Sequence, residues 1–138
     1  MVTGQWMTSR LLRSKANILP CAPRTVDRTV VEAYPALVAD FLGQTRSYKH
    51  DKKPRPAHRE TRRRIVDALP TEICRRRYGV SVLLDAARAR DLVDDPKADL
   101  LDAVLCTVQG AWASRQPGFG IPPDCENEGW IVDPALAP

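Results

Sequence analysis

The sequence lacks any apolar run of the roughly 20 residues that a bilayer-spanning helix needs, and it does not begin with the apolar stretch of a signal peptide. We therefore expect no membrane span and a cytoplasmic location. Only two histidines and four cysteines occur among 138 residues, without a Cys-x-x-Cys pair. This spacing argues against a structural zinc site and favours reduced thiols. Aromatic residues are few, at 6%, but hydrophobic residues reach 43%, enough for the core of one domain.

Charge is distributed unevenly along the chain, although the formal net charge is only +4. Residues 46–77 contain twelve Lys or Arg against four Asp or Glu, a net +8, whereas residues 78–138 sum to −6. A basic middle followed by an acidic end is typical of a protein that meets a polyanion rather than a membrane surface. Runs of charge also occur on solvated helix faces, so both interpretations stay open.

Residue periodicity predicts a helix-rich chain with few strands. Prolines 20 and 23 favour an irregular segment over residues 1–28. The β-branched run after it predicts a strand over 29–34, and Pro35 begins a short helix that Gly43 ends. After a basic loop we expect helices over 59–69, 71–79 and 80–93, and the first residues of the last one can also form a strand. A long helix should then run from Pro96 to about Ser114, with Asp95 as its N-cap. A short strand over 129–132 follows.

The same periodicity predicts which side chains face the core. In the helix over 59–69, three apolar positions fall on one face, so we expect Arg59, Arg62 and Arg63 to point outward. Aromatic side chains in apolar surroundings usually pack inside a protein. The aromatic residues that we expect in the core are Tyr34, Trp112 and Trp130.

The long helix carries Asp99 and Asp102 on one narrow polar stripe, about 60° apart around the helix axis. The helix dipole accounts for an acid in the first turn but poorly for Asp102, which lies deeper in the helix. A buried carboxylate without a partner is costly, and carboxylates at i and i+3 can share a hard cation such as Mg²⁺. Glu32, at the end of an apolar strand, is the candidate third ligand. A metal site and a solvated stripe both remain open.

Four motifs occur in a characteristic order: VVEAYPALV, then YK before an arginine-rich helix, then DLLDAVLCTVQGAWA, then EGWIVDP. In this order they resemble the domain-of-unknown-function family 429, a group of predicted nucleases with an RNase H-like fold. The resemblance implies an irregular segment over 1–28, the C-terminal part of an RNase H-like domain over 29–134, and a tail over 135–138. The implied fold is a helix-rich partial α/β fold, with a few strands flanked by helices and without the N-terminal antiparallel strands.

The resemblance also implies an activity, the metal-dependent hydrolysis of phosphodiester bonds with Mg²⁺ or Mn²⁺. RNase H-like folds hold a further aspartate on their first strand, and the sequence contains no such segment, so it leaves open whether this chain is an active enzyme. By the resemblance, the catalytic and metal-binding acids are Glu32, Asp99 and Asp102, and the residues that bind the nucleic-acid backbone are Lys49, Arg59, Arg62 and Arg63.

Two further functions stay open beside the nuclease. The basic segment suits a protein that binds nucleic acid without cleaving it, in which case affinity falls steeply with salt. The absent N-terminal strands predict an exposed sheet edge and an uncovered apolar patch. Such a chain would form a homo-oligomer or complete its sheet with a partner chain.

Overall fold

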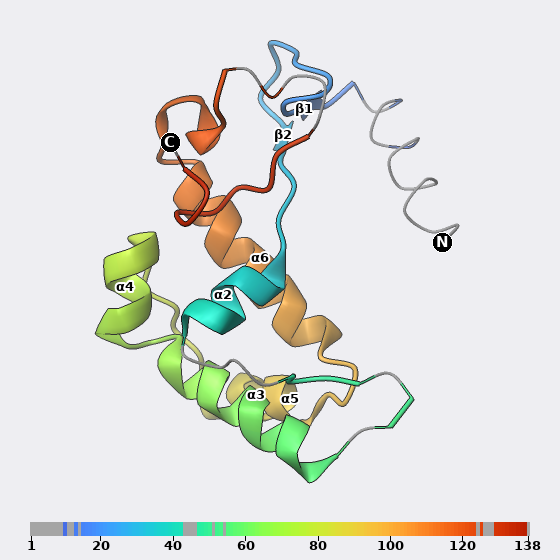
Figure 1. Cartoon of the computed structure of the whole chain (residues 1–138), viewed down its shortest axis with the longest axis vertical. Coiled ribbons are helices and arrows are strands. Elements are labelled where there is room, and N and C mark those ends of the chain that lie inside the picture. Colours follow the sequence, from blue (N-terminus) through green and yellow to red (C-terminus); the bar gives the residue numbers. More distant parts are fainter. Residues whose placement is uncertain are drawn as a thin grey trace.

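One long helix, α6 (Asp99–Ala113), organises the molecule. The computed structural model describes residues 10, 13, 15–42, 47–50, 52–53, 55–123, 125 and 129–137. Figure 1 shows α6 running from a small sheet at one end to a layer of two helices, α3 and α5, at the other. The other elements are β1 (Asn17–Ile18), β2 (Thr29–Val30), α2 (Pro35–Phe41), α3 (Pro56–Ala68), α4 (Glu72–Tyr78), α5 (Ala86–Asp94) and the 3-10 turn η1 (Pro117–Gly120). The predicted helix-rich α/β class is confirmed.

The sheet is short and parallel. Asn17 lies opposite Thr29, and their side chains are joined by a hydrogen bond of 3.0 Å from Asn17 Nδ2 to the Thr29 hydroxyl. Further along, Glu32 forms an isolated parallel bridge to Ile131, where the N–H of Val132 donates to the Glu32 carbonyl at 2.9 Å. The segment over 1–28, expected to be irregular, therefore supplies β1. The strands predicted over 29–34 and 129–132 are shorter than expected, because each finds only a few backbone partners.

The core forms where α2 and α4 pack against α6 and where α3 packs against α5. Leu101 and Leu105 of α6 are fully buried, and Val108 and Trp112 continue the same stripe. Burial of one such side chain contributes about 1.5–3 kcal/mol. The three apolar positions predicted to face inward are buried: Ile65 and Val66 in α3, and Leu69 directly after it.

The start of α6 differs from the prediction. Ala98 adopts a left-handed conformation (φ 59°), so the helix begins at Asp99 rather than at Pro96. The carboxylate of Asp95 still accepts hydrogen bonds from the backbone N–H groups of Lys97 at 3.0 Å and Leu100 at 3.1 Å. Burial alone would raise the pKa of the Asp95 carboxyl, but these backbone hydrogen bonds outweigh it and hold the pKa below its usual range. Asp95 thus caps α6 across one intervening turn.

The segment before α5 is the other departure from the predicted helices. α5 begins only at Ala86, because the Asp85 carboxylate accepts a hydrogen bond from Arg88 N–H at 2.7 Å and caps the helix there. Residues 80–84 have no regular structure, and Leu83 is 90% exposed. Within the described part of the chain, no helix has the length and apolar character that crossing a bilayer requires.

Candidate functional site

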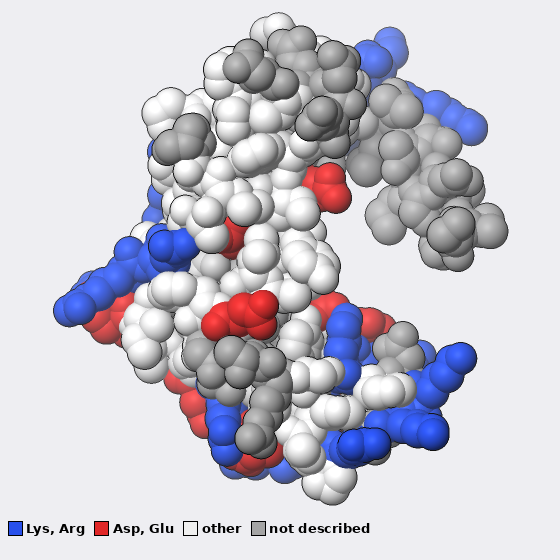
Figure 2. Space-filling model, in the orientation of Figure 1, with Lys and Arg blue, Asp and Glu red and all other residues white. Residues whose placement is uncertain are grey.

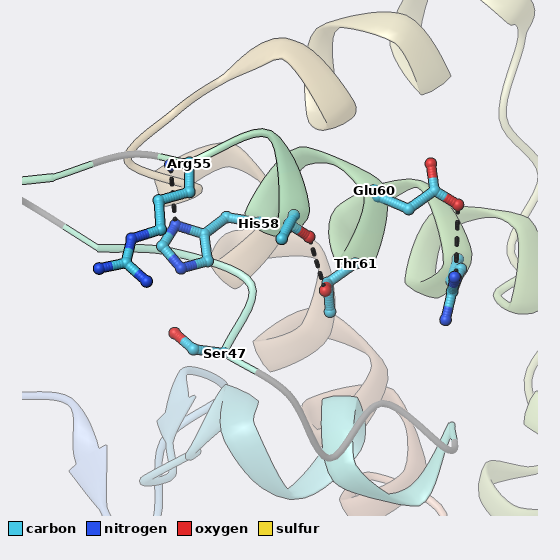
Figure 3. Close-up of a pocket in the computed structure, with 7 residues that line it drawn as sticks. Ser47, Arg55, His58, Glu60 and Thr61 are labelled. Carbon is cyan, nitrogen blue, oxygen red and sulfur yellow. Dashed lines mark hydrogen bonds and ion pairs between the residues drawn. The ribbon is translucent and has the colours of Figure 1, made fainter.

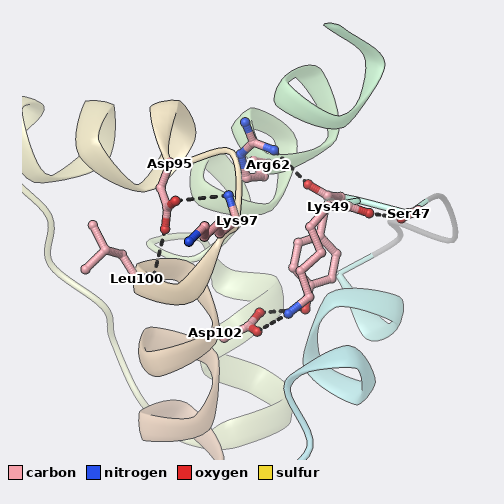
Figure 4. A network of polar contacts seen from close by, with 8 residues as sticks. Ser47, Lys49, Arg62, Asp95, Lys97, Leu100 and Asp102 are labelled. Carbon is pink, nitrogen blue, oxygen red and sulfur yellow. Dashed lines mark hydrogen bonds and ion pairs between the residues drawn. The ribbon is translucent and has the colours of Figure 1, made fainter. Parts of the chain in front are cut away.

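The carboxylate of Asp102 has two protein partners, which form a cluster with it. The Tyr48 hydroxyl donates a hydrogen bond to Oδ1 at 2.8 Å, and the Lys49 ammonium forms an ion pair with Oδ2. Figure 4 shows the Lys49 ammonium directed at the Asp102 carboxylate from the segment that precedes α3. The side chains of Lys49 and Asp102 are 36% and 21% exposed. α6 begins at Asp99, so Asp102 lies in its first turn, and the Tyr-Lys motif supplies the cation that pairs with it. We call Tyr48, Lys49 and Asp102 the Asp102 cluster.

Burial and the charge of Asp102 together raise the pKa values of the Tyr48 phenol and the Cys106 thiol. Burial raises the pKa of the Tyr48 phenol, and the hydrogen bond to Asp102 raises it further, so Tyr48 remains a donor. Cys106 lies one turn further along α6, and burial followed by the negative charge of Asp102 raises the pKa of its thiol. A raised pKa disfavours the thiolate, which is the nucleophilic form of cysteine. Asp102 thus lies beside one cation, Lys49, and two neutral groups, the Tyr48 phenol and the Cys106 thiol.

The structure does not gather the three predicted acids into one metal-binding group. Asp99 is exposed in the first turn of α6, and Glu32 is exposed at its bridge to Ile131. Two residues after Glu32, the N–H of Tyr34 donates to Gln109 Oε1 at 2.9 Å, seven residues and about 10 Å along α6 from Asp102. Among the described residues, no group of three or more Asp, Glu, His or Cys side chains is placed to hold a metal ion. The described residues therefore do not show the metal site that the family resemblance implies, and that site stays a prediction.

The prediction that Arg62 faces outward is wrong. Arg62 is only 3% exposed, and its Nε donates to the Val93 carbonyl while Nη1 donates to the Tyr48 carbonyl, both at 2.8 Å. Burial lowers the pKa of this guanidinium. α3 packs on α5 along the side that carries Arg62, so the guanidinium satisfies carbonyl groups at the end of α5 and at Tyr48. Arg62 is therefore a structural link, and Figure 4 draws it above Lys49 and Asp102.

The other three predicted phosphate-binding residues lie in different surroundings. Lys49 pairs with Asp102, as described, and the Arg59 guanidinium pairs with Asp94 at 2.7 Å in an exposed salt bridge. Arg63 is exposed and has no ion pair to any described residue. Of the four predicted residues, Arg63 is therefore the one presented to solvent without a partner in the described chain.

A second carboxylate network, around Asp133, was not predicted. Asp133 is 1% exposed, and its Oδ2 accepts from Gln109 Nε2 at 2.7 Å and from the Tyr78 hydroxyl at 3.1 Å. Burial raises the pKa of the Tyr78 phenol, and the charge of Asp133 raises it further. The only signal for this Asp133 network (Tyr78, Gln109 and Asp133) in the sequence was Gln109, a polar residue between Leu105 and Trp112 on the buried stripe of α6.

Of the three aromatic residues predicted in the core, two pack there and one is exposed. Trp112 is buried, and Trp130 packs partly buried against the core. Tyr34 was wrongly placed there, since it is 53% exposed. Its backbone N–H is bound by Gln109, while its side chain lines an open hollow of about 350 Å³ together with Tyr48 and Lys49.

Basic side chains gather at several places on the surface. Figure 2 shows one group at the lower right, over the loop before α3 and the start of α3, another at the left, on α4, and a further one at the upper right. The arginines on α4 include Arg75 and Arg76, which both pair with Glu72. In the described part of the loop before α3 and in α3 itself, the exposed cations that have no ion pair to a described residue are Lys52, Lys53, Arg55 and Arg63.

The fold and these surfaces define a helix-rich α/β chain with a basic helix and two carboxylate networks on its central helix. Residues 5–126 match the model of a family described as a protein of unknown function, DUF429. The chain therefore belongs to this family. The match includes residues 5–28, which we expected to precede the family domain, and ends before the last residues that we expected within it. No curated protein and no solved structure matches the chain.

Proposed function

We propose that this chain binds the phosphate backbone of a nucleic acid through α3 and the loop before it. The observation that carries the proposal is the surplus of cations there. Lys52, Lys53, Arg55 and Arg63 are exposed and have no ion pair within the described residues. Such a surplus attracts a polyanion and releases its counterions on binding, independently of nucleotide sequence.

A groove between α3 and α5 supports the same function. It has a volume of about 280 Å³, and Arg59, Arg63 and Arg90 line it together with Asp67. Neither Arg63 nor Arg90 has an ion pair within the described residues. The guanidinium group matches phosphate oxygens with two parallel hydrogen bonds. The exposed pair of Arg59 with Asp94 contributes about 0–1 kcal/mol, so a phosphate can replace the carboxylate at little cost.

The test is the salt dependence of binding to labelled single- and double-stranded oligonucleotides. Each phosphate contact to duplex DNA contributes about −0.9 to the slope of log K against log salt. We expect Arg63→Gln with Arg90→Gln to make that slope shallower by about two contacts. The matched control is Arg75→Gln with Arg76→Gln, which removes the same charge from α4. A flat salt response, or an equal effect of the two double variants, would contradict the proposal.

Hydrolysis by this chain and its cytoplasmic location stay predictions. Both oxygens of Asp102 accept hydrogen bonds from protein groups, so the geometry favours binding over metal-dependent cleavage. The same oligonucleotides, incubated with Mg²⁺ or Mn²⁺, test the cleavage directly. Cleavage by the wild-type chain that disappears in Asp102→Asn would establish the nuclease and replace the simpler binding function.

A further inference from the structure

A small pocket on the opposite side of α3 from the arginine groove gathers groups that bind phosphate. Its volume is about 230 Å³, and it is lined by Ser47, Arg55, His58, Arg64 and their neighbours on α3. Figure 3 shows Ser47, Arg55 and His58 around one end of the pocket and Glu60 at the other. The pocket is too small for a nucleotide but has room for one phosphate group.

The imidazole of His58 is held in one orientation. Its Nδ1 accepts a hydrogen bond from the backbone N–H of Arg55 at 3.2 Å, as drawn in Figure 3. The ring also stacks on His50, with ring centroids 6.1 Å apart and 16° between the planes. Since Nδ1 is an acceptor, the ring proton lies on Nε2, which makes Nε2 a hydrogen-bond donor. His58 thus presents a fixed donor without requiring a positive charge.

Two guanidinium groups complete the donor set. Arg55 is exposed and has no ion pair within the described residues, whereas Arg64 makes one long contact of 3.4 Å to Glu60. The hydroxyls in the lining do not compete for this function, because Ser47 donates to the Lys49 carbonyl and Thr61 to the Ala57 carbonyl. Glu60 is the one carboxylate in the lining, and Arg64 offsets its charge.

We propose that this pocket binds the phosphomonoester end of a nucleic-acid strand. A terminal phosphate carries up to two charges and three free oxygens, which match the donors of Arg55, His58 and Arg64 better than a backbone diester does. The inference that this phosphate group belongs to a nucleic-acid strand rests on the proposed function. It is supported by the exposed cations Lys52 and Lys53, which lie in the loop just before Arg55. The pocket then fixes the end of a strand whose backbone continues along the basic surface.

The first experiment tests the strand end. One single-stranded oligonucleotide is compared with and without a terminal phosphate, at the 5′ end and at the 3′ end. We expect one phosphorylated form to bind roughly tenfold more tightly, and Arg55→Gln and His58→Leu to remove that preference. Arg75→Gln, which removes the same charge from α4, should retain it. Equal binding of all forms, or a preference that survives Arg55→Gln, would overturn the inference while leaving backbone binding intact.

A second experiment tests the pocket without a strand. Inorganic phosphate is titrated into the wild-type chain while the ring resonances of His58 are followed by NMR. We expect a saturable shift that is absent in Arg55→Gln, with circular dichroism confirming that the variant is folded. Absence of the shift would contradict the inference that this pocket binds phosphate. If the resonances shift but no oligonucleotide binds, the proposed function and the strand as ligand are both overturned. Equal affinity for inorganic phosphate and for the phosphorylated strand overturns them as well.

Discussion

Asp102 and Asp133 are both joined to α6, yet their carboxylates are stabilised in different ways. Asp102 lies near the start of the helix, partly exposed, and pairs with the charged ammonium of Lys49. Asp133 lies beside the second half of the helix and is 1% exposed. Within the described residues its side chain accepts from uncharged donors, among them Tyr78 and Gln109. Each network contains one tyrosine hydroxyl, so the two differ mainly in the cation and in access to water.

The difference shows that a carboxylate on an apolar helix does not require a metal ion. Lys49, which lies 53 residues earlier in the chain, forms an ion pair with Asp102. Asp133 is stabilised by hydrogen bonds from two neutral groups, the Tyr78 hydroxyl and the Gln109 amide. The energetic consequences are opposite. Water can solvate Asp102 when a partner is lost, whereas loss of a group in the Asp133 network leaves buried polar atoms without partners.

The largest effect should follow from Asp133→Ala. This change leaves the Tyr78 hydroxyl and Gln109 Nε2 buried without an acceptor, and each unsatisfied group costs about 1–3 kcal/mol. We expect the free energy of unfolding to fall by about 3–5 kcal/mol, measured by urea denaturation. Asp91→Ala, at an exposed position of α5, is the control and should change stability by less than about 0.5 kcal/mol. Equal losses in the two variants would mean that the buried network contributes nothing.

Tyrosine-to-phenylalanine variants compare the two networks with one chemical change. Tyr78→Phe removes a donor to a carboxylate that water does not reach, and should cost about 1.5–3 kcal/mol. Tyr48→Phe removes a donor to Asp102, which keeps Lys49 and some contact with water, so we expect about 1 kcal/mol. Both values come from urea denaturation at neutral pH. A larger loss in Tyr48→Phe than in Tyr78→Phe would reverse the comparison.

Alkaline pH probes the same two hydroxyls. Burial raises the pKa of both Tyr48 and Tyr78 above the ordinary tyrosine value of about 10. The unfolded chain then loses these protons at lower pH than the native chain, so stability is complete below about pH 10 and falls as pH rises above it. Each phenylalanine variant should lose less stability over this range than the wild-type chain does. Tyrosinate absorbance and circular dichroism, followed together, test whether these phenols ionise only as the chain unfolds.

Local pattern was sufficient to predict α6 and the buried face of α3, because both depend on apolar spacing within one helix. It was not sufficient for the contacts between distant segments. The pairing of Lys49 with Asp102 spans 53 residues, and Gln109 meets Asp133 only because the segment after Ile131 returns beside α6. Periodicity could not place Arg62 either, since its burial depends on the carbonyl groups that α5 and Tyr48 present. The metal site was predicted on the assumption that Asp102 has no protein partner. Its partner Lys49 lies in a distant segment of the chain, and helical periodicity does not reveal such contacts.

The smallest effect should come from Lys49→Met, which removes the cation and keeps most of the aliphatic side chain. An ion pair this exposed contributes about 0.2–1 kcal/mol, so we expect a loss within that range. Salt should reduce the loss, because it screens exposed charges. The cost of Asp133→Ala, which arises from buried neutral donors, should be nearly independent of salt. Lys52→Met, an exposed lysine without an ion pair in the described chain, is the matched control. A loss in Lys49→Met that is large and insensitive to salt would show that Asp102 depends on its cation as fully as a buried carboxylate depends on its donors, and the distinction between the two networks would disappear.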